Sequence, residues 1–223
     1  MAGKLNLIFS HKFDMPIWKY RISNSGDYFA FELRAENSDE LKFLSLDMKE
    51  AKVEEIKLKK DDWWTTLYDV DELVVYFKRY DSGANPVILS VIRWNSDTKS
   101  EELLPGDTNI TFKKNSLVTP SFYTPENEHY TLLSRFIGNI VDHEPNKSGI
   151  EYLEWNNYIS LSYYTGVKNM ANFLLTVNDT KEAVHHICLA ENLTGIGQDT
   201  FSVDNNKLIF VKDNCEIFIY QHG

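Results

Sequence analysis

Short segments rich in aromatic and β-branched residues recur along the whole chain. Most alternate apolar and polar residues or form a compact apolar run, and each has the length of a β-strand. Clusters of Asn, Asp, Ser and Gly, such as Asn24-Ser25-Gly26-Asp27, lie between these segments and favour tight turns. The strands predicted from this pattern include residues 28–33, 41–46, 73–77, 87–94, 158–164, 207–211 and 216–220.

The spacing of the strands predicts a repeat. Strand-like segments begin near Trp18, Trp63, Asn109, Asn157 and Asp199, at intervals in the mid-forties of residues. A four-stranded propeller blade has roughly 40–45 residues. We therefore predict an all-β fold, a small β-propeller of about five blades, with residues 1–223 forming a single β-propeller-like domain.

The two ends of the chain suggest how this fold closes. After Asp199 there is room for only three strands, and the apolar segment from Leu5 to Phe9 precedes the first repeat without a blade of its own. An unpaired sheet edge exposes backbone donors and acceptors. We therefore expect the N-terminal segment to pair with the C-terminal strands.

The alternative fold class is α+β. Residues 48–59 contain many good helix formers, although their apolar positions fit a strand, turn and strand at least as well. Residues 134–142 and 168–177 fit either a helical turn or a strand.

Composition and charge exclude several classes of protein. The chain has 223 residues, 43% hydrophobic and 25% charged, which is typical of a soluble globular protein. Its net charge of −10 repels phosphate backbones and anionic lipid surfaces, so neither nucleic acid nor a membrane is an expected partner. The N-terminus lacks the apolar core of a signal peptide, which predicts a cytoplasmic protein whose two cysteines are thiols.

Motifs for catalysis and cofactors are scarce. Adjacent side chains on a strand point to opposite faces, so His185 and His186 are poorly placed to share one metal ion. Gly195-Ile196-Gly197 lacks the third glycine of a dinucleotide fingerprint and is interpreted as a turn. We predict no catalytic residue, metal or cofactor from motifs, although an acid–base pair needs no fixed spacing.

Aromatic residues are the remaining signal, at 13% of the chain. Trp63-Trp64 follows Asp61-Asp62, and two prolines frame the loop that contains Tyr123 and Glu126. Such aromatics either pack between sheets or offer a stacking surface for a sugar, a peptide or another flat ligand. The candidate binding residues are Trp18, Asp61, Trp63, Trp64, Tyr123 and Glu126.

Four short segments carry a family resemblance, namely Pro16-Ile17-Trp18, Trp63-Trp64, Pro120-Ser121-Phe122-Tyr123-Thr124-Pro125-Glu126 and Asp199-Thr200-Phe201. With them the chain resembles an uncharacterised bacterial family, chiefly from Bacteroidetes, that has only a domain-of-unknown-function label. The resemblance implies a propeller-like fold and no particular reaction, ligand or catalytic residue.

The function predicted from these observations is that of a non-enzymatic binding or interaction scaffold. Its loops and central funnel would receive a protein or a small ligand, because rigid rings of strands present many loops on one face. The alternative is a hydrolase or lyase that uses carboxylates such as Asp61, Asp62 or Glu126 together with a histidine.

Overall fold

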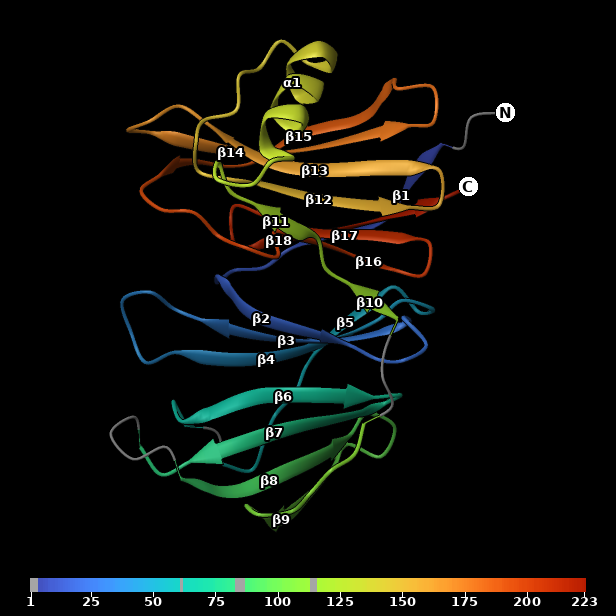
Figure 1. The fold of residues 1–223 in the computed structure, drawn as a ribbon. Coiled ribbons are helices and arrows are strands. Elements are labelled where there is room, and N and C mark those ends of the chain that lie inside the picture. Colours follow the sequence, from blue (N-terminus) through green and yellow to red (C-terminus); the bar gives the residue numbers. More distant parts are fainter. Residues whose placement is uncertain (1–3, 61, 83–86, 113–115) are drawn as a thin grey trace. The chain divides into compact units, whose positions relative to one another are not determined.

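The computed structural model describes residues 4–60, 62–82, 87–112 and 116–223, and these residues are mostly β-structure. Their strands form four antiparallel sheets, two with five strands and two with four (Figure 1). The chain divides into two compact units. Unit 1 contains Met1–Lys12 and Leu117–Gly223, and unit 2 contains Phe13–Ser116.

Unit 2 consists of two four-stranded sheets in which neighbours in the chain are neighbours in the sheet. The first contains β2 (Ile17–Ile22), β3 (Tyr28–Arg34), β4 (Leu41–Asp47) and β5 (Lys52–Glu55). The second contains β6 (Thr65–Asp71), β7 (Val74–Tyr80), β8 (Ile88–Asn95) and β9 (Ser100–Pro105). Buried residues of both sheets share one apolar core, in which the rings of Phe43 and Phe77 lie 4.6 Å apart.

Unit 1 contains the two five-stranded sheets. One has the order β1 (Leu5–Lys12), β18 (Glu216–His222), β17 (Lys207–Lys212), β16 (Phe201–Asp204) and β10 (Leu117–Val118). The other has the order β11 (Ser121–Tyr123), β12 (Ile150–Trp155), β13 (Tyr158–Thr165), β14 (Met170–Asn178) and β15 (Ala183–Leu193). The helix α1 (Tyr130–Ile140) packs its buried Ile137 against the second sheet, in a cluster with Leu161 and Tyr163.

The first and last strands of the chain pair with each other, as predicted. β1 and β18 are antiparallel, with Leu5 opposite His222 and Lys12 opposite Glu216 (Figure 1). β18 is therefore hydrogen-bonded on both sides, by β1 and by β17. The pairing covers the backbone groups that β18 would otherwise expose at a sheet edge.

The strand predictions are confirmed, and the β-rich fold replaces the α+β alternative. Each predicted strand overlaps an observed one, and residues 48–59 form a turn followed by β5. Ala51 adopts a φ of 49° in that turn, which removes it from helical geometry. Of the two ambiguous segments, 168–177 is a strand (β14), whereas 134–142 belongs largely to α1.

The described residues form four sheets, whereas the spacing predicted about five blades. The segment expected to begin a repeat near Asn109 contains no strand among its described residues before β10. β10 and β11 are short strands that extend two existing sheets instead of starting a new one. In the part of the chain that the structure describes, no helix is long and apolar enough to span a membrane.

Candidate functional site

Two neighbouring edge strands of unit 2 carry aromatic side chains at β-bulges. β2 and β6 each lie at the edge of their own sheet and contact each other. Trp18 is the extra residue in the pairing of β2 with β3, and Tyr68 is the extra residue in the pairing of β6 with β7. A bulge redirects the side chain of the extra residue. Consistent with this, Trp18 is 69% exposed although it lies within a strand.

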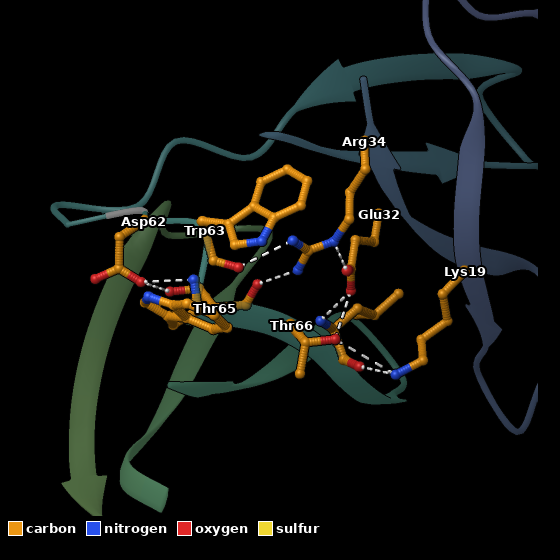
Figure 2. Close-up of polar contacts among 9 residues, drawn as sticks. Lys19, Glu32, Arg34, Asp62, Trp63, Thr65 and Thr66 are labelled. Carbon is orange, nitrogen blue, oxygen red and sulfur yellow. Dashed lines mark hydrogen bonds and ion pairs between the residues drawn. The ribbon is translucent and has the colours of Figure 1, made fainter. Parts of the chain in front are cut away.

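The guanidinium of Arg34 lies close to two indoles. Its central carbon is 4.4 Å from the ring centroid of Trp63 and 6.0 Å from that of Trp18. Arg34 is the last residue of β3, and its Nη1 and Nη2 donate to the backbone oxygens of Trp63 and Thr65, both at 2.9 Å (Figure 2). These two bonds connect the first sheet of unit 2 to the start of β6. The exposed indole of Trp18 is thus backed by a fixed cation.

The carboxylate of Glu32 fixes the position of the Arg34 guanidinium. Its side chain is fully buried, and its Oε1 accepts a hydrogen bond of 2.6 Å from Nε of Arg34. Its Oε2 accepts from the hydroxyl of Thr66 and from the backbone N–H of Leu67, both at 2.7 Å. A buried carboxylate is tolerated only when it is paired and hydrogen-bonded in this way. The pair therefore holds Arg34 in one orientation (Figure 2).

Further cations lie beside this pair. Nζ of Lys19 donates to the backbone oxygen of Leu67 at 2.8 Å, and burial together with Arg21 lowers the pKa of its ammonium. Nε of Arg21 donates to the backbone oxygen of Tyr68, whose ring lies 3.4 Å from Nζ of Lys78. Lys19 is thus surrounded by positive charges, which the buried Glu32 offsets only in part.

We call Trp18, Lys19, Arg21, Arg34 and Lys78 the basic aromatic surface. It concentrates positive charge on a chain whose net charge is −10. Chemically it offers an exposed indole for stacking and a local excess of positive charge that attracts an anion.

The other predicted residues near Trp63 have structural partners. Oδ1 of Asp62 accepts from the backbone N–H of Trp64 and from the hydroxyl of Thr65, and its Oδ2 is 3.9 Å from Nε of Arg79. Asp62 therefore orders the turn before β6 (Figure 2). Trp64 is 41% exposed, and Asp61 lies outside the described residues.

The loop candidates belong to the other unit. The Tyr123 ring contacts Tyr152 and His129 edge-on in unit 1, at centroid distances of 6.2 Å and 6.0 Å. Glu126 is exposed, and a hydrogen bond from Thr124 lowers the pKa of its carboxyl. The structure thus groups Trp18 with Trp63 around Arg34, whereas Tyr123 and Glu126 lie in the other unit.

The adjacent histidines face opposite sides of their sheet, as predicted. His185 contacts the rings of Phe210 and Tyr220, whereas His186 contacts Tyr163 on the side of α1. Burial lowers the pKa of His185 to about 4. Among the described residues no group of three or more His, Cys, Asp or Glu side chains is placed to hold a metal ion.

The sequence interpretation missed Glu32 and Arg34, which determine the geometry of the site. One signal was available, because Glu32 lies between Phe31 and Leu33 in a strand that is apolar on both faces. A charge in such a strand must find a buried partner. The partner itself follows only from the fold.

Comparisons with known proteins assign no function. No family model matches the chain, and no curated protein matches it. TolB from Acinetobacter baumannii is a similar solved structure, with 12% identity and a TM-score of 0.28 over 96% of this chain and 46% of TolB. The chain thus spans about half the length of that protein.

Two other similar structures match over nearly their whole length. A member of the DUF4221 family from Bacteroides vulgatus has 7% identity and a TM-score of 0.30, and the match covers 100% of this chain and 98% of the other. BamB from Moraxella catarrhalis has 10% identity and a TM-score of 0.26, with 97% and 99% covered. An uncharacterised family is thus among the similar structures, and membership of any one family stays a prediction.

Proposed function

We propose that the protein is a non-enzymatic binding protein, and that its basic aromatic surface receives an anionic ligand with a flat ring. The observation that carries this proposal is the 69% exposure of Trp18 over the guanidinium of Arg34. A large indole that stays in solvent within a strand does not contribute its burial to folding. Its apolar area remains available for burial by a ligand.

The surface is ordered before any ligand arrives. Three hydrogen bonds hold Arg34, one of them to the buried Glu32, and Lys19 is bonded to the neighbouring strand. Side chains that are already fixed lose little conformational entropy on binding. This pre-organisation supports a binding role for the surface.

Electrostatics selects the charge of the ligand. The ammonium of Lys19 is repelled by the charges of Arg21, Arg34 and Lys78. An anion bound among these cations is attracted to each of them and also reduces their mutual repulsion. The remaining surface of an acidic protein repels the same anion. We therefore expect binding to weaken as salt is added.

The test compares pairs of ligands that share their rings and differ in charge. Isothermal titration calorimetry would use triglucuronate against its methyl ester, and adenosine monophosphate against adenosine. We expect the charged member of at least one pair to bind and its neutral partner to bind much more weakly. In Trp18→Ala the affinity should fall by a factor of about 5 to 150, since stacking on an aromatic ring contributes on the order of 1–3 kcal/mol.

Trp64→Ala is the matched control, because Trp64 is also exposed but is not stacked on Arg34. We expect its affinity to equal that of the unmodified protein. Binding that survives in Trp18→Ala, or that does not distinguish charged from neutral ligands, would contradict the proposal.

The alternative of a hydrolase or lyase gains no support at this site. Asp62 is engaged by Trp64, Thr65 and Arg79, and Glu126 belongs to the other unit. An acid–base mechanism needs two such groups to converge on one substrate.

We also propose that residues 1–223 form a single β-propeller-like domain, in a cytoplasmic bacterial protein. The path of the chain supports the first part. It leaves unit 1 after Lys12 and returns at Leu117, so unit 2 is an insertion tethered at both ends. Two covalent connections therefore join the two units.

A further inference from the structure

Unit 1 contains a buried tyrosine hydroxyl between two imidazoles. Oη of Tyr163, on β13, lies 2.8 Å from Nδ1 of His143 and 2.9 Å from Nε2 of His186. His143 follows α1 in the chain, and His186 lies on β15. The centroids of the two imidazole rings are 5.0 Å apart, and the ring of Phe173 packs against both. The three polar groups thus form one short hydrogen-bonded chain.

The number of protons on these three groups decides whether both hydrogen bonds of the tyrosine hydroxyl can form. The hydroxyl has one proton, so it donates to one imidazole and accepts an N–H from the other. One imidazole can gain a second proton on its outer nitrogen without disturbing either bond. When both imidazoles are cationic, both donate to the hydroxyl, and its own proton has no acceptor within the chain. Because Tyr163 is fully buried, that state is costly.

Charged side chains line the cavity beside His143. His143 lines a cavity of about 390 Å³ together with Arg135 of α1 and with Asp142 and Glu144 of its own segment. On the side of β13 and β15, burial and the nearby Cys188 raise the pKa of Tyr163. Strand β14 contributes Phe173, which carries no charge. On the opposite face of the sheet, burial and the neighbouring His186 lower the pKa of His185.

Both partial burial and the neighbouring His143 lower the pKa of His186. Protonation of His186 is therefore disfavoured, and we assign the second proton to it. The second proton must displace the Tyr163 O–H from Nε2 of His186, and this breaks the chain at its centre.

The segment held by this chain is short and anchored at both ends. The backbone N–H of Val141 donates to Ile137 at its start, and the backbone N–H of Asn146 donates to Tyr164 at 2.7 Å at its end. Residues 142–145 between these anchors all line the cavity. His143 connects them to the sheet through Tyr163.

We propose that His143, Tyr163 and His186 form a site that holds one excess proton and that acts as a latch. When these three residues bind no excess proton or one, their hydrogen bonds hold residues 142–145 against the sheet. A second proton breaks the chain, releases this segment and changes the wall of the cavity. The cavity is thereby sensitive to acid, in a pH range set by the two coupled histidines.

The test is a titration of the full-length protein followed by nuclear magnetic resonance of histidine side chains and backbone amides. His143 and His186 should titrate in two steps separated by at least about one pH unit, a tenfold difference in proton affinity. The amides of residues 142–145 should shift mainly in the more acidic step. His129, which is exposed and outside the chain, serves as the internal control.

Two variants distinguish the latch from a purely structural cluster. In Tyr163→Phe the separation between the steps should shrink and the acidic step of the amides should disappear. If that variant fails to fold, His186→Gln tests the same point, because glutamine accepts from Tyr163 without titrating, and only the His143 step should remain. A common pKa for both histidines, or amides that shift in the first step alone, would overturn the proposal.

Discussion

The side chain of Glu32 has no exposed surface, and the fold supplies its partners at two points far apart in sequence. Removing the charge by Glu32→Gln leaves the largely buried Arg34 without a counter-charge. We expect the free energy of unfolding to fall by about 3 kcal/mol, as when other buried ion pairs are broken. Guanidinium chloride unfolding measures this loss.

Trp18→Ala is the comparison for that measurement. Its side chain is mostly exposed, and the contact with Arg34 at 6.0 Å is a cation–π interaction at the surface. We expect a cost of about 1 kcal/mol or less. Equal costs for the two variants would show that the Glu32–Arg34 pair is not a structural anchor.

His185 makes stability depend on pH. Burial lowers its pKa from 6.5 to about 4, so the folded state binds its proton less readily than the unfolded state does. The associated stability is present above pH 6.5 and is lost as the pH falls toward about 4. Urea unfolding between these values should show this loss, and His185→Phe should remove the corresponding part of it. An unchanged pH profile in the variant would contradict the assignment.

At the scale of single residues, the sequence predicts exposed aromatics more readily than their partners. Trp18 and Trp63 could be selected as candidates because large aromatics either pack or bind. Arg34 could not be selected, because its role depends on meeting the backbone of Trp63 and Thr65 across two sheets. Tyr123 and Glu126 share the composition of a binding loop and lie in another unit.

At the scale of elements, alternation of apolar and polar residues predicts most strands, because the period of two is a direct result of the pleat. It does not predict bulges, since an extra residue becomes visible only when the partner strand is known. The bulges at Trp18 and Tyr68 are therefore absent from the sequence prediction. The helix α1 begins at Tyr130, so the ambiguous segment 134–142 contains only part of the apolar face that marks it as a helix.

The pairing of β1 with β18 gives a prediction at this scale. Deleting residues 1–12 exposes the edge of β18 and removes the buried Leu5. We expect a lower melting temperature and concentration-dependent association, because an open edge pairs with other chains. A synthetic peptide of residues 1–12 should restore the melting temperature, whereas a scrambled peptide should not. A truncated protein as stable as the full chain would show that the pairing contributes little.

At the scale of the whole molecule, the spacing of the strands predicts where sheets lie along the chain better than it predicts the number of sheets. Four repeats correspond to sheets, while the region near Asn109 lies before two short strands that join existing sheets. Spacing alone cannot separate a new sheet from an extension of an old one, because both require only a strand and a turn. The single domain can be tested by calorimetry.

We expect one cooperative heat-unfolding transition with equal calorimetric and van't Hoff enthalpies. The two tethers between the units favour this result. Two separate transitions would mean that unit 1 and unit 2 are independent domains.

The central claim is that Trp18, backed by Arg34, receives a ligand. The chain has five tryptophans, so its indole N–H resonances form a small and assignable set. During titration with triglucuronate or adenosine monophosphate, whichever binds, the resonances of Trp18 and Trp63 should shift, and those of Trp94 and Trp155 in the cores should stay unchanged. Shifts confined to other indoles, or none at Trp18 when the ligand is bound, would contradict the account.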